Sequence, residues 1–331
     1  MACLVPPVGD AFDAATHLSM TVAGAESNVA MYLADDGVPV QWVSRVGDDP
    51  FGRRILRTVA ACGVDVSGVE IDRHRPTGLL IKEPRVSATR VHYYRTNSAA
   101  ASMTDAVILH ERVRSAPLLH LTGITPALSP SCAHLVRTAL APGEHRARVV
   151  SFDVNYRPAL WRDPPGMTLL RLANQADIVF VGLDEADNLW GPCPDAETVR
   201  ALIPDPQVLV VKDGPRAATA FTGSTATCVP ALRVPVVEVV GAGDAFAAGF
   251  LAGVLRGEST ETALRRGHIT AASALQVTGD HGPLLPVATF QRLLTASDQD
   301  WARPIPDLPA ALPDARLTSA DDHCRTEVSA P

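Results

Sequence analysis

The sequence predicts an α/β fold in which a largely parallel β-sheet is covered by helices. Short runs of β-branched and apolar residues alternate along the chain with longer amphipathic segments, which is the pattern of such sheets. Several of the short runs are apolar throughout, as expected of strands that are buried on both faces. With 331 residues, 47% of them hydrophobic and 20% charged, the chain can bury a large core in one or two domains.

The main sheet is predicted to contain strands at residues 40–44, 118–122, 149–153, 178–181 and 208–212, with helices in the gaps between them. Between residues 73 and 101 the pattern changes to two alternating segments, 77–82 and 90–95, without a stretch of helix length. We expect a small β-sheet there that acts as a lid. After about Trp301, Pro, Asp, Ala and Ser dominate without periodicity, so residues 302–331 are expected to be a disordered tail.

The composition excludes several classes of protein. A net charge of −7 without any basic run argues against a nucleic-acid surface. The longest apolar run, residues 245–255, is too short to cross a bilayer, and the first thirty residues do not resemble a secretion signal, so a cytoplasmic location is expected. No C-x-x-C pair occurs among the six cysteines and no H-x-x-x-H pair among the ten histidines, so no zinc site, disulfide framework or catalytic histidine is predicted.

One Gly-rich turn carries the strongest chemical signal. Gly241-Ala242-Gly243-Asp244 leads directly into a helix of small apolar residues. Backbone N–H groups in such a turn, together with the positive end of the helix, stabilise an anion without a lysine. A carboxylate repels phosphate, so Asp244 is explained if it takes a proton from an attacking hydroxyl during phosphoryl transfer. The alternative is a tight turn in which Asp244 is an N-cap.

Several motifs, taken in order, resemble the PfkB (ribokinase-like) carbohydrate kinases over roughly residues 4–295. The signature regions are Gly24-Ala25-Glu26-Ser27-Asn28, Gly47-Asp48-Asp49-Pro50-Phe51-Gly52 and the turn at Gly241. Within this family the chain looks most like the 2-keto-3-deoxygluconate kinases, because of Tyr93-Tyr94-Arg95, Gly123-Ile124-Thr125-Pro126-Ala127-Leu128-Ser129, Asp153-Val154-Asn155-Tyr156-Arg157 and Gly279-Asp280-His281.

The resemblance implies a ribokinase-like three-layer α/β/α fold over residues 1–300, with a mostly parallel sheet and a small lid from about 4–23 and 73–101. Lids of this family often pair with a second subunit, so a homo-oligomer through the lid is expected. Family members usually begin with an apolar strand that ends in an acidic residue, about ten to fifteen residues before the position of Leu4. This strand is expected to be missing, either because the true start lies upstream or because the product is impaired. Asp10 follows a glycine, as the acidic residue at the end of that strand does, but it aligns with the first lid segment instead.

The same resemblance assigns the catalytic machinery. Asp244 matches the catalytic base, and Gly241, Ala242 and Gly243 match the anion hole for the transferred phosphoryl group. Gly24, Asn28 and Asp280 match positions that hold sugar hydroxyls, whereas Tyr93, Arg95 and Arg157 match the part that faces an acidic sugar. Each has an ordinary alternative: Asn28 as a plain helix residue, Asp280 as a turn cap, and the arginines as surface ion pairs.

ATP and Mg²⁺ are the implied cofactors. Lys212 and Gly214 match the K-x-G motif near the nucleotide, and His268 matches positions near the adenine. Glu185 matches the last residue of the family's N-x-x-E motif and would act on Mg²⁺ through water, a role that Asp184 would share. The chain departs from the family at Gly182, Ala217 and Leu80, where an Asn, a second Gly and often a Tyr are expected.

Three functions remain open on the sequence. The first is ATP-dependent phosphorylation of the terminal hydroxyl of 2-keto-3-deoxygluconate, or of a close acidic sugar, with Asp244 as the base. The second is a PfkB kinase for another substrate such as fructose, ribose or a nucleoside, which would be favoured if the two arginines turned outward. The third is a non-catalytic sugar-binding relative, suggested by the missing strand and by Gly182.

Overall fold

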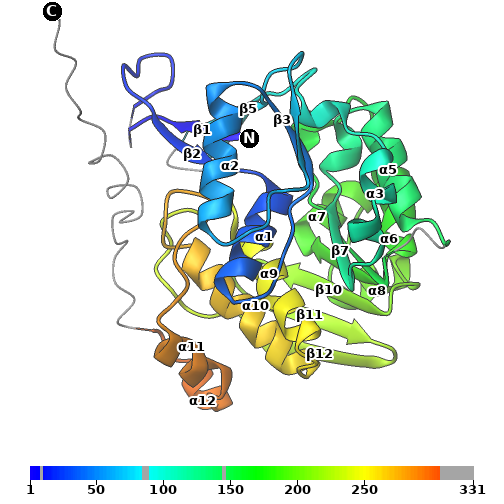
Figure 1. Ribbon diagram of the computed structural model, residues 1–331. Helices are drawn as coiled ribbons and strands as arrows, with labels where there is room; N and C mark the ends of the chain where they lie inside the picture. Colours follow the sequence, from blue (N-terminus) through cyan, green and yellow to red (C-terminus); the bar gives the residue numbers. More distant parts are fainter. Residues whose placement is uncertain (8–9, 84–88, 144–146, 306–331) are drawn as a thin grey trace, which may run out of the picture.

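The computed structural model describes residues 1–7, 10–83, 89–143 and 147–305. Within these ranges a six-stranded sheet lies between two layers of helices, and a four-stranded sheet stands apart from it (Figure 1). The three-layer α/β/α arrangement predicted from the sequence is confirmed.

The six-stranded sheet runs in the order β12-β11-β10-β9-β8-β7, with the last four strands of that order parallel and the first two forming an antiparallel edge. Its strands are β7 (Leu118–Thr122), β8 (Val149–Asp153), β9 (Ile178–Gly182), β10 (Val208–Asp213), β11 (Ala217–Thr222) and β12 (Thr225–Pro230). Successive side chains face opposite helical layers: Phe180 and Val210 pack on one side, and Val179 and Leu209 on the other. The parallel strands are therefore buried on both faces.

The helices divide between the two faces of this sheet. One layer contains α1 (Ala25–Asp35), α9 (Ala242–Leu255), α10 (Thr260–Ala274), α11 (Val287–Leu294) and α12 (Asp298–Trp301). The other contains α3 (Ala106–Leu109), α4 (Glu111–Arg114), α5 (Pro130–Leu140), α6 (Gly166–Gln175), α7 (Leu183–Trp190) and α8 (Ala196–Leu202). Short 3₁₀ turns occur at Ala100–Ser102, Thr125–Ala127 and Pro158–Leu160. Across the described ranges, every helix falls short of the length and apolarity that a bilayer span requires.

Four of the five strands predicted for the main sheet are confirmed, and the fifth prediction, residues 40–44, is wrong. The strand there, β3 (Ser44–Gly47), starts four residues later and pairs in parallel with β4 (Val69–Asp72) in a small sheet that packs beside α2 (Pro50–Ala61). Just upstream, the chain makes an isolated bridge to Asp65 instead of a ladder. The bridge consists of a bond from the Trp42 N–H to the Asp65 carbonyl and one from the Asp65 N–H to the Val40 carbonyl, and it does not continue into a strand.

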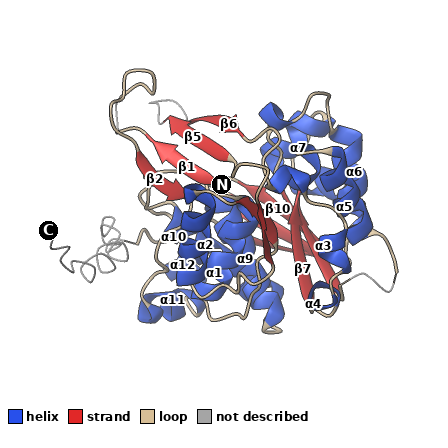
Figure 2. Ribbon diagram, turned by 45° about the horizontal axis from the view of Figure 1, so that its top comes forward, coloured by secondary structure: helices blue, strands red, loops and turns tan. Residues whose placement is uncertain are grey.

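The separate sheet has the order β2-β1-β5-β6 and lies to one side of the main sheet (Figure 2). Its strands are β1 (Ala2–Val5), β2 (Ser19–Val22), β5 (Leu79–Glu83) and β6 (Arg90–Tyr94). It buries Cys3, Val5 and Leu80 against Ala23, which directly follows β2. Asp10 lies between β1 and β2, outside the main sheet. A homo-oligomer through this sheet stays a prediction.

The segment after Trp301 differs in part from the expected tail. Trp301 donates its indole N–H to the Pro230 carbonyl at 2.8 Å, and Ile305 is only 8% exposed within the core beneath α10. The tail boundary expected at Ala302 is therefore wrong for residues 302–305, because one more apolar side chain finds a buried site. The rest of the expected tail, residues 306–331, lies outside the described residues.

Where α9 packs against α10, we expect the stability of the fold to be sensitive to a single added methyl group. A Cβ at Gly249 would lie 2.5 Å from the Thr270 hydroxyl and 2.6 Å from the Arg266 carbonyl oxygen. Gly249→Ala is expected to lower the free energy of unfolding by about 1–3 kcal/mol, since backbone must move to admit the methyl. Urea unfolding measures this loss.

The matched control is Gly243→Ala in the same helix, because the added methyl would meet its nearest neighbour at 3.5 Å. Equal stability of the two variants would contradict the packing argument.

Candidate active site

The candidate site lies where the carboxyl ends of β7, β8, β9 and β10 meet the first turn of α9. Parallel strands end at the same edge of a sheet, so residues that follow them converge there. Asp153 ends β8, Lys212 lies near the end of β10, and Asp244 lies in the first turn of α9. Asp153 and Asp244 are buried, at 1% and 8% exposure.

The Gly-rich turn has the backbone that an anion site requires. Gly241 adopts φ 92°, a left-handed conformation that favours glycine. A Cβ there would also lie 2.6 Å from the Asp280 carbonyl oxygen, so the absence of a side chain lets the turn and the Asp280 segment touch. Ala242 and Gly243 then form the first turn of α9, where amide groups lack a partner one turn earlier in the helix.

Two amides hold the Asp244 carboxylate in place. Asn28 donates Nδ2–H to Oδ2 at 2.8 Å, and Asn155 donates Nδ2–H to Oδ1 at 3.2 Å. Burial raises the pKa of Asp244 to about 7, with a further increase from the Asp153 charge, while the hydrogen bond from Asn28 opposes the change. A carboxylate that titrates near neutral pH is suited to accept a proton from an alcohol.

Asn28 also connects Asp244 to Asp280. The same Nδ2 lies 3.4 Å from Asp280 Oδ2, and the other oxygen of Asp280 forms an ion pair with Lys82 from strand β5. The side chains of Asn28, Asp280 and Lys82 are all buried, although they come from α1, the loop after α10 and the four-stranded sheet. The structure thus brings the predicted Asn28, Asp244 and Asp280 together.

Two buried oxygens in this group are available to a ligand. Asn28 Oδ1 and Asn155 Oδ1 have no hydrogen-bond partner within the described residues. Buried polar atoms in folded proteins are nearly always paired, so unpaired ones beside a carboxylate suggest that a hydroxyl-bearing ligand completes them. Gly24 is the residue before α1, one turn from Asn28, and its carbonyl accepts the amide N–H of Asn28 at 2.8 Å.

Sequence reasoning missed Asn155 and Lys82. Asn155 has φ 39°, a strained conformation for a residue with a side chain, and such strain is concentrated at functional sites. It belongs to the motif 153–157 already quoted for the family resemblance, so the motif was the available signal. Lys82 gave no signal, because a lysine in an alternating strand is ordinarily exposed.

Tyr93 lies near the end of β6 and Arg95 directly follows that strand, whereas Arg157 comes from the loop after β8. Burial raises the pKa of Tyr93, and the guanidinium groups of Arg157 and Arg95 both oppose the change, so both charges act on the same hydroxyl. Arg95 Nε is buried without a hydrogen-bond partner within the described residues. Arg157 lies 3.4 Å from Glu185 and keeps 43% of its side chain exposed. The second positive group is thus partly paired within the protein.

Lys212 and Glu185 form a charged group beside the anion turn. Lys212 Nζ lies 3.0 and 3.3 Å from the two Asp153 carboxylate oxygens. Burial lowers the pKa of Lys212, but the carboxylates of Asp153 and Glu185 outweigh it, so the pKa is raised and the charge retained. A Cβ at Gly243 would lie 3.5 Å from Lys212 Nζ, which brings this ammonium next to the anion turn.

The remaining predicted residues have different surroundings. Gly214 lies in the turn between β10 and β11 with φ 50°. Asp184 is exposed in the first turn of α7. Glu185 accepts N–H groups from Gly182 at 2.9 Å and Tyr156 at 3.1 Å, and burial raises its pKa.

His268 is the exception among the predicted residues. The residue is 7% exposed, and its ring centroid lies 5.0 Å from that of Phe246 and 6.3 Å from that of Trp301. Its Nε2 lies 3.0 Å from the Val229 carbonyl oxygen. Burial lowers the pKa of His268 to about 4, so the ring is neutral in the core. The side chain faces α9 and α12, and the adenine contact expected at His268 stays a prediction that this packing does not support.

The sequence matches the pfkB family carbohydrate kinases over residues 7–287. It is 38% identical to a 2-dehydro-3-deoxygluconokinase of Bacillus subtilis (strain 168), across 79% of this chain and 83% of that protein. A protein of the same name from Thermoproteus tenax is 33% identical, across 83% and 86% of the two chains. The solved structure of a PfkB protein from Polaromonas sp. JS666 superposes with a TM-score of 0.76 at 34% identity, across 83% and 93%. The family match spans both the anion turn and Asp280, and the chain belongs to the pfkB family of carbohydrate kinases.

Proposed function

We propose that this ATP-dependent sugar kinase phosphorylates the terminal hydroxyl of 2-keto-3-deoxygluconate. The observation that carries the proposal is the buried Arg95 Nε, which has no hydrogen-bond partner in the described part of the chain, together with the charge of Arg157, which like that of Arg95 acts on the Tyr93 hydroxyl. A sugar acid has a carboxylate for the arginines and hydroxyls for the acidic end, whereas a neutral sugar has no use for the arginines. The names of the relatives from Bacillus subtilis and Thermoproteus tenax support the same substrate.

In this mechanism Asp244 is the general base. It takes the proton from the terminal hydroxyl as that oxygen forms a bond to the γ-phosphorus of ATP and the bond from phosphorus to the ADP oxygen breaks. Asn28 and Asn155 hold the carboxylate through one oxygen each, and Asp280 accepts a second sugar hydroxyl. The amides of Gly243 and its neighbours stabilise the charge on the transferred group, with Lys212 beside them.

The residues present are compatible with Mg²⁺ bound through water. Both oxygens of Glu185 already accept backbone N–H groups, so a direct metal bond would compete with them, but their remaining lone pairs can bind a hydrated ion. Mg²⁺ keeps several of its waters in such sites. We propose that Glu185, assisted by exposed Asp184, holds the ion in this way. Bound there, Mg²⁺ would neutralise charge on the phosphates.

The substrate proposal is tested by an ADP-release assay with 2-keto-3-deoxygluconate, gluconate, fructose and ribose. Arg95→Met keeps the stem of the side chain and removes the charge. It is expected to raise KM for the keto-deoxy acid about 10–100-fold, since a lost charge-assisted hydrogen bond is worth about 1.5–3 kcal/mol. KM for ATP should stay unchanged.

The matched control is Arg112→Met, whose guanidinium is on the surface with 65% of the side chain exposed. Faster turnover of fructose or ribose than of 2-keto-3-deoxygluconate, together with an unchanged KM in Arg95→Met, would indicate a neutral-sugar kinase. Ligand-induced stabilisation without ADP release would indicate a binding protein.

The pKa of Asp244 predicts the pH dependence of the reaction. Because the base works when deprotonated, kcat/KM is expected to rise with pH and level off above an apparent pKa of about 7. Asp244→Asn should reduce kcat by about 10²–10⁴-fold and abolish this rise. A profile of kcat/KM against pH measures both; a flat wild-type profile through this range would rule out Asp244 as the base.

The same carboxyl group predicts a dependence of stability on pH. The folded-state pKa of Asp244 lies above its ordinary value of 3.8, at about 7. The folded state therefore favours the protonated form, and its stability decreases as pH rises between these two values. Asp244→Asn removes this loss, so urea unfolding should show the variant gaining on the wild type from about pH 4 to about pH 7. A constant difference would contradict the shifted pKa.

A further inference from the structure

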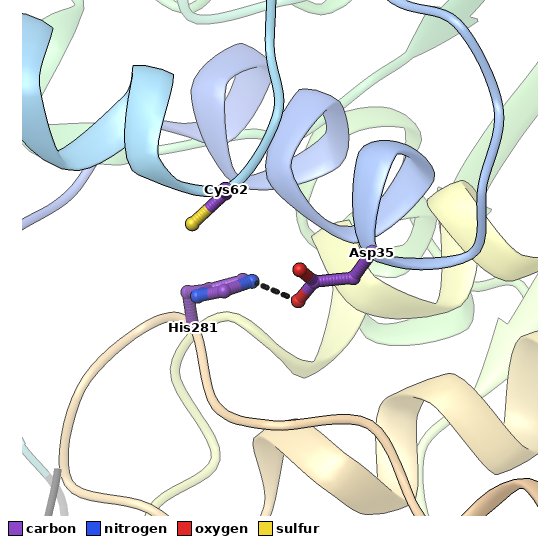
Figure 3. Close-up of side chains that lie close together, drawn as sticks. All are labelled: Asp35, Cys62 and His281. Atoms are coloured by element: carbon purple, nitrogen blue, oxygen red, sulfur yellow. Dashed lines mark hydrogen bonds and ion pairs between the residues drawn. The ribbon is translucent and has the colours of Figure 1, made fainter. Parts of the chain in front are cut away.

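A second group of side chains lies outside the kinase machinery, and we propose that it binds a divalent transition metal ion of the zinc class. Asp35, Cys62 and His281 each offer one ligand atom, and these atoms all lie within 4.8 Å of one another. Figure 3 shows the thiol, the carboxylate and the imidazole turned toward a common space. The ring Nε2 of His281 lies 2.9 Å from Asp35 Oδ2.

Three separate elements supply these side chains. Asp35 is the last residue of α1, Cys62 directly follows α2, and His281 lies in the loop between α10 and α11. No short sequence motif joins them, which is why the scattered cysteines and histidines gave no prediction of a metal site. The three side chains come together because α1 packs against α2 and against the loop between α10 and α11.

The surrounding charge favours a cation at this point. Asp35 and Cys62 stand at the C-terminal ends of two helices of 11 and 12 residues, where the helix dipoles carry partial negative charge. A carboxylate adds a full negative charge to the same space. The electrostatic field is thus opposite to that of the anion turn at the start of α9.

The donor set selects the class of metal. A thiolate, an imidazole nitrogen and one carboxylate oxygen are ligands of zinc and similar ions, whereas Mg²⁺ and Ca²⁺ prefer oxygen alone. Three protein ligands leave a fourth tetrahedral position for water. The side chains of Asp35 and His281 are 11% and 16% exposed, so an ion can reach them from solvent.

Binding requires small movements and releases a proton. Tetrahedral zinc holds its ligands at about 2.0–2.3 Å, so the ligand atoms must stand roughly 3–4 Å from one another. The His281 and Asp35 atoms would part slightly, and the thiol would approach. Cys62 loses its proton to solvent as the sulfur–metal bond forms, and His281 binds as the neutral ring through Nε2.

Metal binding at this site would also affect the loop that presents Asp280 to the proposed sugar site. His281 directly follows Asp280, its ring lies 4.6 Å from the Tyr32 ring, and the neighbouring Gly282 amide donates to the Tyr32 hydroxyl at 2.9 Å. A metal on His281 would fix the loop that presents Asp280. An effect of the metal on sugar binding rests on the proposed function, whereas the proposed metal binding does not.

The test is a Co²⁺ titration of the full chain after treatment with a chelator, in a background with Cys228→Ser and Cys324→Ser. We expect one equivalent to produce a thiolate-to-cobalt charge-transfer band, which Zn²⁺ then displaces. Cys62→Ser and His281→Gln should weaken Co²⁺ binding at least about tenfold, and Cys62→Ser should remove the band. The matched control is His134→Gln, which breaks an exposed His–Asp pair at 3.5 Å that has no place in the proposed site.

A second measurement needs no ligand-removing variant. Zn²⁺ at one equivalent is expected to slow alkylation of Cys62 about tenfold or more and to slow amide exchange in residues 279–282. Absence of the cobalt band, or its persistence in Cys62→Ser, would overturn the proposal, as would unchanged alkylation. These optical and chemical readouts are independent of kinase activity, so a failed substrate assignment would leave them unaffected.

Discussion

The hydrogen bonds that Asn28 makes to two carboxylates connect the parts of the active site. Its single Nδ2 group lies between Asp244 on α9 and Asp280 after α10, while its own backbone is in the second turn of α1. Two buried acids that face each other repel, and an amide donor between them lowers that repulsion without adding a charge. The base retains a high proton affinity, because the amide counteracts burial only in part.

The four-stranded sheet contributes to the same arrangement through Lys82. This ammonium is fully buried and forms an ion pair with Asp280, so the buried carboxylate has an opposite charge beside it. An ion pair at this depth is weak support for stability but a strong constraint on position, because breaking one partner leaves an unpaired buried charge. The four-stranded sheet is therefore joined to the helix layer at α1 by charge, while Leu80 and Val5 pack within the sheet itself.

The parts that the sequence could predict are those whose chemistry is local. The turn at Gly241 and the strands β7 to β10 are specified by neighbouring residues, through backbone freedom in one case and continuous apolar character in the other. Lys82 and the group of Asp35, Cys62 and His281 depend on contacts between distant segments, which leave no pattern along the chain.

Two residues near local motifs have surroundings that differ from expectation, for other physical reasons. His268 occupies a core position because Val229 supplies a carbonyl partner and Phe246 a ring to pack on, and neither is visible from the helix pattern of α10. Ile305 is buried because it belongs to the same apolar cluster as Trp301 and the buried residues of α11, although the sequence around it has the composition of a tail. In both cases tertiary packing overrides local composition.

The close contact between Gly241 and the Asp280 backbone has a consequence for ligand design. The Gly241 turn, the proposed seat of the transferred phosphate, touches the backbone of Asp280, the proposed sugar-facing acid, with no side chain between them. Because the two backbones are in direct contact, a displacement of the Gly241 turn also displaces Asp280. An inhibitor that joins a phosphate mimic to a sugar acid would thus meet one continuous surface, and its linker must match a fixed spacing instead of an adjustable one.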